Sequence, residues 1–268
     1  DRAAMTAMLW EFANKFRDAN KEPEVPELPV GNDWDSRVSW DIARYFMKYY
    51  RMDVAGLWAW AEARFHGKAK FWRSNEDCPG YGGMTMYDML YYALPAQYDT
   101  FFEDGTAKRM ADYGMAVMNN LGGHAGFGDT SSMGAIGYWA GIFNVCAWKL
   151  KDGRYLYAYD HSPGGGRGNY SYNSYRQTEI EPVLPEDMLG IHVIPLPDWV
   201  YENREKMLGT APSQMNPILD ADPTPPYEEC FDKIVFRTSF EKSDQYMIMG
   251  GISHGYHAHP DGNSIIEM

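Results

Sequence analysis

Apolar residues recur every three or four positions through the first half of the chain, which is the spacing of a helix with one buried face. Such stripes cover residues 5–16, 38–49, 54–65, 110–121 and 136–150. Polar or glycine-rich turns separate them, and Asp35, Asp53 and Thr106 precede three of them as candidate N-caps. The pattern predicts successive helical hairpins around a common centre. The sequence contains no repeat of fixed length, which disfavours a solenoid.

The pattern changes after Asp152. Residues 162–175 are rich in glycine and serine and predict a loop, and prolines then recur through Pro226, which favours an extended linker. Residues 233–240 and 245–251 are β-rich runs around a charged turn, and 263–268 predict a third strand. We therefore predict a helical domain over residues 1–180, a proline-rich linker over 181–228, and the start of a β-domain over 229–268.

Composition narrows the class of partner. The apolar content of 45% can support a sizeable core, and the 15% of aromatic residues suits both a core and a carbohydrate cleft. A formal charge of −13 argues against nucleic acid or an anionic membrane as partner.

No apolar run is long enough to span a membrane. The three cysteines are too widely spaced for a CxxC motif or a dense disulfide framework. The chain reads as a piece of a longer protein, so a missing signal peptide is no argument against export.

The sequence HGYHAHPD at residues 254–261 carries the strongest chemical signal. In extended backbone, residues i and i+2 share a face, so His257 and His259 can address one cavity. Neutral imidazoles at this spacing commonly bind zinc, and Asp261 can ligate the metal or orient a ligand. Two histidines leave a tetrahedral site incomplete, so other ligands would come from elsewhere. A surface turn and a cupin metal motif are the competing interpretations, although Glu267 lies too far on for the cupin spacing.

Residues 232–266 resemble the start of the β-domain of heparinase II/III-like polysaccharide lyases. The similarity lies in an arginine-bearing strand, a second strand, a glycine-rich turn and His-x-His-x-Asp with a small polar tail. Weaker similarities are GFGDTSS at 126–132, the stretch 183–198, and the tyrosine-bearing helix start at 74–93. The resemblance implies an α+β protein in which an incomplete (α/α) toroid precedes an antiparallel β-sandwich, with the active site between them.

The resemblance also implies a reaction and residues for it. These lyases cleave uronic-acid polysaccharides by β-elimination, which needs a base for the C5 proton, an acid for the leaving oxygen and donors that neutralise the carboxylate. Catalysis is carried over to Tyr81 and His257, carboxylate binding to Asn32, and structural zinc to His259 with Asp261. Asp33 stands where the family often has His, so the acid–base pair stays open. Further candidates for substrate binding are Trp34, Arg37, Tyr87 (also the second choice for the catalytic tyrosine), His124 and Asn263.

We therefore expect a periplasmic or secreted bacterial lyase whose partner is an anionic polysaccharide. One alternative is an (α/α)-toroid glycoside hydrolase, with Glu76, Asp77 and Asp129 as candidate carboxylates. The other is a non-catalytic glycan-binding protein on the same fold. Absorbance of an unsaturated uronate product would separate elimination from hydrolysis.

Overall fold

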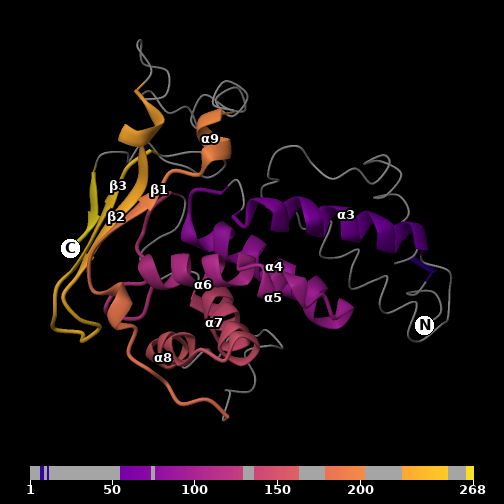
Figure 1. Ribbon diagram of the computed structural model, residues 1–268, viewed down its shortest axis with the longest axis horizontal. Helices are drawn as coiled ribbons and strands as arrows, with labels where there is room; N and C mark the ends of the chain where they lie inside the picture. The colour runs from indigo at the N-terminus through magenta and orange to yellow at the C-terminus, as the bar shows by residue number, and fades with distance from the viewer. Residues whose placement is uncertain are drawn as a thin grey trace.

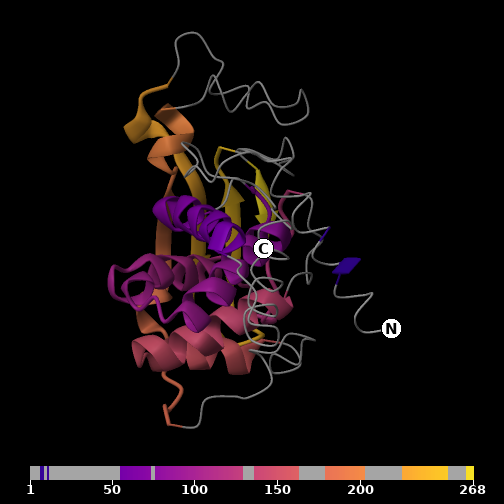
Figure 2. The same ribbon diagram turned by 90° about the vertical axis from the view of Figure 1, so that its right-hand side faces the viewer.

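The computed structural model describes residues 7–8, 11, 55–73, 76–128, 136–162, 179–202, 225–252 and 264–268. Within them, seven α-helices and a four-stranded antiparallel sheet confirm the predicted mixture of helix and antiparallel strand. The helices lie on one side of the sheet (Figures 1 and 2). The predicted toroid and sandwich are finer statements that these residues do not show.

The helical part packs around Trp139. Its helices are α3 (Ala55–Phe71), α4 (Pro79–Ala96), α5 (Thr100–Glu103), α6 (Thr106–Ala116), α7 (Ile136–Leu150) and α8 (Gly153–His161). Both α4 and α6 pack on α7, where Trp139 is fully buried. A Cβ on Gly83 or on Gly114 would lie 2.5 or 2.4 Å from the indole, so both close approaches require glycine. Three of the predicted stripes, at 54–65, 110–121 and 136–150, correspond to α3, α6 and α7.

The sheet has the order β1-β2-β3-β4, with β1 (Gly190–Pro195), β2 (Phe231–Arg237), β3 (Tyr246–Gly250) and β4 (Ile265–Glu267). Strands β2, β3 and β4 confirm the predicted β-runs. Strand β1 lies inside the segment predicted as linker and pairs with β2 from Gly190 to Pro195. The short elements η2 (Glu186–Met188), α9 (Asp198–Glu202) and η4 (Tyr227–Glu229) flank β1 and β2.

A buried cluster of four charges fixes the start of β2 to the segment between α3 and α4. The Arg73 guanidinium donates to Asp232 and, at 3.3 Å, to Asp77. The ammonium group of Lys233 donates to Asp77 at 3.1 Å and to Asp232 at 2.8 Å. All four side chains are at most 2% exposed. Two cations and two carboxylates therefore balance one another within the junction.

A β-bulge explains how two adjacent residues of one strand reach the same cluster. Ile194 pairs with Lys233 and Pro195 with Phe231, so Asp232 has no partner on β1. An extra residue in one strand bends it and redirects its side chains. Burial lowers the pKa of Lys233, but Asp232 and Asp77 outweigh burial and raise that pKa above its ordinary value. Lys233 is therefore a cation at neutral pH although it is buried.

The other end of β2 is fixed by Arg237, which is 1% exposed. Its guanidinium donates to Asn120 Oδ1 at 2.8 Å and to the Met118 carbonyl, both just beyond α6. The Asn120 amide in turn donates to the carbonyls of Glu241 and Asp244 in the β2–β3 turn, at 3.0 Å each. The ring of Phe240 lies 4.0 Å from the guanidinium carbon. The sheet thus meets the helical part through both ends of its second strand.

We expect the Asp232→Ala substitution to lower the free energy of unfolding by about 3–5 kcal/mol, since it leaves a net positive charge buried. Urea unfolding at pH 7 measures this change. Asp187→Ala is the matched control, because Asp187 pairs with Arg154 at the surface with its side chain 56% exposed. That substitution should cost no more than about 1 kcal/mol. Equal costs for the two variants would contradict the anchoring role of the cluster.

Candidate functional site

Tyr81 lies in the first turn of α4, four residues after Asp77 of the buried cluster. The helix starts at Pro79 after the extended N-cap residue Cys78, immediately past Asp77. The Trp139 indole donates to the Pro79 carbonyl at 2.9 Å and so ties this helix start to α7. The Tyr81 side chain is partly exposed. A partly exposed tyrosine at a fixed helix start is a reasonable acid–base candidate, because both access and position are available to it.

The histidine segment is anchored at the same junction. Its predicted site residues His257, His259, Asp261 and Asn263 lie outside the described residues, but the residues on either side of it are described. Before it, Gly251 and Ile252 donate from their amides to the carbonyls of Asp232 at 2.7 Å and Phe231 at 2.9 Å. After it, the Ser264 carbonyl accepts from the Gly250 amide at 2.9 Å.

These contacts relate Tyr81 to the histidine segment through one cluster. Asp77, four residues before Tyr81, and Asp232, whose carbonyl holds Gly251, share the cations Arg73 and Lys233. The start of α4 and the described residues that flank segment 253–263 therefore lie at the same end of the sheet. The remaining N-terminal candidates, Asn32, Trp34 and Arg37, lie outside the described residues.

Two other predicted residues lie in the core of the helical part. Tyr87 in α4 is fully buried, with its ring 6.0 Å from that of Tyr138. His124 is fully buried and stacks on Trp139, with ring centroids 5.1 Å apart. Burial lowers the pKa of His124 to about 3, although a backbone interaction with Gly114 opposes this shift. Neither side chain offers an exposed surface to a substrate, and their role in substrate binding stays a prediction.

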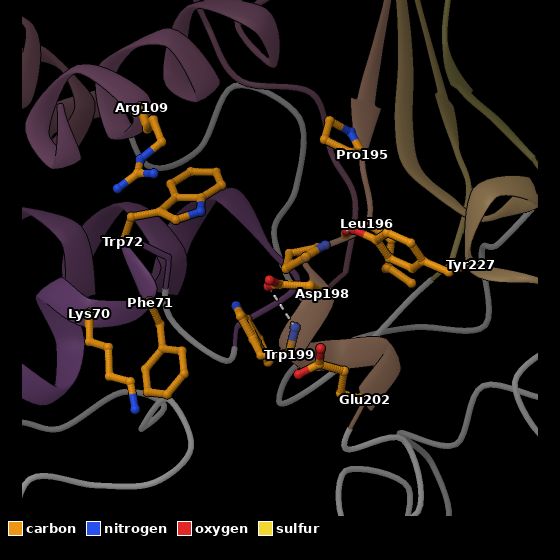
Figure 3. A pocket seen from close by; sticks show the side chains of 11 residues that line it. Lys70, Phe71, Trp72, Arg109, Pro195, Leu196, Asp198, Trp199, Glu202 and Tyr227 are labelled. Atoms are coloured by element: carbon orange, nitrogen blue, oxygen red, sulfur yellow. Dashed lines mark hydrogen bonds between the residues drawn. The ribbon is translucent and has the colours of Figure 1, made fainter.

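The sequence did not predict a pocket that the structure contains (Figure 3). The end of α3 and helix α6 form one wall of this pocket, and the end of β1 and helix α9 form the other. Its volume is about 550 Å³, and a hollow of about 320 Å³ adjoins it and shares Trp72, Arg109 and Pro195 with it. Lys70 and Arg109 line the helical side, and Asp198, Glu202 and Tyr227 line the opposite side. The sequence showed little sign of this pocket, because its charged residues come from different helices and form no local motif.

Among the described residues, no group of three or more His, Cys, Asp or Glu side chains could hold a metal ion. The predicted zinc ligands are outside that part of the chain, so zinc remains a prediction. None of the described helices combines the length and apolar character that a membrane crossing requires.

Comparisons with protein-family models, with curated proteins and with solved structures found no match to this chain.

The buried His124 gives stability a specific pH dependence. Its pKa is about 3 in the folded protein and about 6.5 when unfolded, so between these values only the unfolded state binds the proton. The contribution of His124 to the free energy of unfolding is therefore fully present above about pH 6.5. It falls by about 1.4 kcal/mol per pH unit as the pH drops below that value. His124→Phe keeps a ring on Trp139 but cannot bind the proton.

Urea unfolding at pH 7.5 and pH 5.0 should then show the native protein losing about 2 kcal/mol more than His124→Phe between the two values. Identical losses in the two proteins would mean that the imidazole is protonated in the folded state or is not buried.

Proposed function

We propose that this protein is a polysaccharide lyase, exported to the periplasm or secreted by a bacterium, that cleaves a uronic-acid-containing glycan by β-elimination. One observation carries the proposal: the helix start that bears Tyr81 follows a residue of the buried charge cluster, and the described residues before the segment that bears His257 are bonded to Asp232 and Phe231 at that cluster. Residues 176 positions apart can act on one sugar only if the fold brings their segments together, and this cluster is a means of doing so.

In the proposed reaction, a base removes the C5 proton of the uronate and an acid protonates the departing glycosidic oxygen. The C4–O bond breaks and a C4–C5 double bond forms, with no other reactant required. Tyr81 and His257 form the acid–base pair, and Asn32 donates to the carboxylate so that charge can develop on it. The partly exposed Tyr81 suits this role better than Tyr87, whose side chain is fully buried.

The finer fold is proposed with the function. Packing of α3 on α4, of α4 and α6 on α7, and of α7 on α8 agrees with part of an (α/α) toroid. The sheet face away from the helices carries apolar side chains on every strand, and Ile191, Val193 and Ile265 are 72%, 59% and 60% exposed. An apolar face of this kind is what a second sheet covers in a β-sandwich.

The hydrolase alternative receives less support. It requires two carboxylates that flank a cleft. Glu76 and Asp77 are only 2% and 1% exposed, and Asp77 is occupied by two buried cations. Asp129 lies outside the described residues. A non-catalytic glycan-binding protein would retain the pocket described above but would show no turnover.

Tyr81→Phe tests the catalytic assignment. We expect turnover, followed as ultraviolet absorbance of the unsaturated uronate product, to fall by about two orders of magnitude or more, which is the usual contribution of a general acid or base. Folding should be unaffected, since only a hydroxyl group is removed. Tyr98→Phe is the control: Tyr98 lies just past the other end of α4, where its ring contacts Phe65 and His66.

Retention of most of the elimination rate by Tyr81→Phe would remove Tyr81 from the mechanism. Cleavage of uronate glycans by the native protein without the ultraviolet product would instead favour hydrolysis.

We also propose that His259 and Asp261 help to hold a structural zinc ion. Metal analysis of the purified protein should find about one zinc per chain. His259→Ala should lose it, whereas His192→Ala should keep it, because the His192 ring is already engaged with the Leu189 carbonyl at 3.0 Å. Equal zinc contents in the two variants would exclude His259 as a ligand.

A further inference from the structure

The pocket between α3, α6 and β1 has two walls of opposite charge. Lys70 and Arg109 on the helical wall are exposed, as are Asp198 and Glu202 on the wall formed by α9. Within the described part of the chain, no ion pair joins the two walls, and neither cation has a carboxylate partner there. Figure 3 shows Arg109 beside Trp72 and Lys70 beside Phe71, with Glu202 on the other wall, and the Lys70 ammonium lies 5.0 Å from the centre of the Phe71 ring. Unpaired charges that line a cavity of this size are available to a ligand.

Trp72 forms part of the helical wall through an unusual backbone conformation. Its φ of 50° is in the left-handed region, which a bulky residue rarely adopts. This turn sends three consecutive side chains in different directions. Phe71 packs against Trp199, Trp72 points toward Pro195 and lines the pocket, and Arg73 enters the buried charge cluster. The indole forms a T-shaped contact with Tyr113, with ring centroids 6.0 Å apart, and its partly exposed side chain can stack on a ligand in the pocket.

The opposite wall is held in place by hydrogen bonds to the backbone. The Tyr227 hydroxyl donates to the Leu196 carbonyl at 2.7 Å, and Tyr201, which contacts the Tyr227 ring, donates to the Pro225 carbonyl at 2.9 Å. One Asp198 oxygen accepts from the Trp199 amide at 2.8 Å, which leaves its other oxygen for a ligand. A wall fixed in this way limits the ordering cost of binding.

We infer that this pocket binds one unsulfated uronate residue of the glycan. The sugar carboxylate lies at Arg109, the ring stacks on Trp72, and hydroxyls on the far edge donate to Asp198 and Glu202. A sulfate on that edge would bring a second negative charge to the acidic wall and be repelled. This inference rests on the proposed function, because it names the substrate class. Of the predicted site residues that the structure describes, Tyr81, Tyr87 and His124 do not line the pocket.

Binding of defined tetrasaccharides tests the inference without relying on turnover. The probes are unsulfated chondroitin, its sulfated counterpart, its carboxyl-reduced counterpart and oligomannuronate, each titrated by calorimetry into the protein carrying Tyr81→Phe. We expect at least one unsulfated uronate probe to bind and both altered chondroitins to bind more weakly than the parent. In that background, Arg109→Gln should weaken binding by about tenfold or more, as loss of a hydrogen bond to a charged group implies.

Trp72→Gly should weaken binding to a similar extent, and glycine at this position also relieves the left-handed backbone. The matched controls are Lys108→Gln, which removes a neighbouring charge that pairs with Asp112, and Trp148→Ala, which removes an indole exposed on α7. Both should stay within about twofold of the parent.

Three results would overturn the inference: no binding of any unsulfated uronate probe, tighter binding of the sulfated one, or unchanged binding in both pocket variants. The proposed function fails separately, if the protein binds these probes through the pocket but the native protein forms no unsaturated product. If the native protein forms the unsaturated product while the Arg109→Gln and Trp72→Gly variants bind the probes normally, the proposed lyase function stands and the inferred ligand site is wrong.

Discussion

Buried charges on β2 determine how the helical part and the sheet meet. Asp232, Lys233 and Arg237 are all at most 2% exposed, and each reaches a partner that belongs to the helical part. A buried charge that loses its partner costs several kcal/mol. A shift of the sheet along the helices by even one residue would separate these partners, so the interface is restricted to one register. Apolar packing alone would tolerate more than one arrangement.

The position of the pocket and of the start of α4 follows from that register. At the cluster, Asp77 leads into the start of α4 and Asp232 holds the residues that precede the histidine segment, so the predicted catalytic elements share one support. The adjoining pocket uses the other side of the same connection, since Trp72 directly precedes Arg73. Damage to the cluster is therefore expected to affect both sites together, whereas substitutions in the pocket leave the cluster intact.

Much of the architecture was predictable because its signals are local. The stripe around Trp139 predicted α7, and the runs around Val235 and Ile248 predicted β2 and β3. Strand β1 was missed because nearby prolines indicated a linker, and because its exposed positions carry apolar residues, Ile191 and Val193, where a half-buried strand usually has polar ones. The charge cluster could not be predicted, since Arg73 and Asp232 are 159 positions apart and no local pattern pairs them. The histidine motif was visible for the opposite reason: its chemistry lies within eight residues.

The charge of the pocket walls bears on an apparent conflict between the chain and its proposed substrate. A protein with a formal charge of −13 repels a polyanion at long range, and salt screens that repulsion beyond about 10 Å. Within the pocket, the nearest groups decide, and there Arg109 and Lys70 lie on one wall and Asp198 and Glu202 on the other. Such a site can accept one carboxylate but gains little from a second negative group. An acidic protein of this kind is therefore better suited to a glycan with one charge per uronate residue than to a densely sulfated one, because the global and the local fields then favour the same ligand.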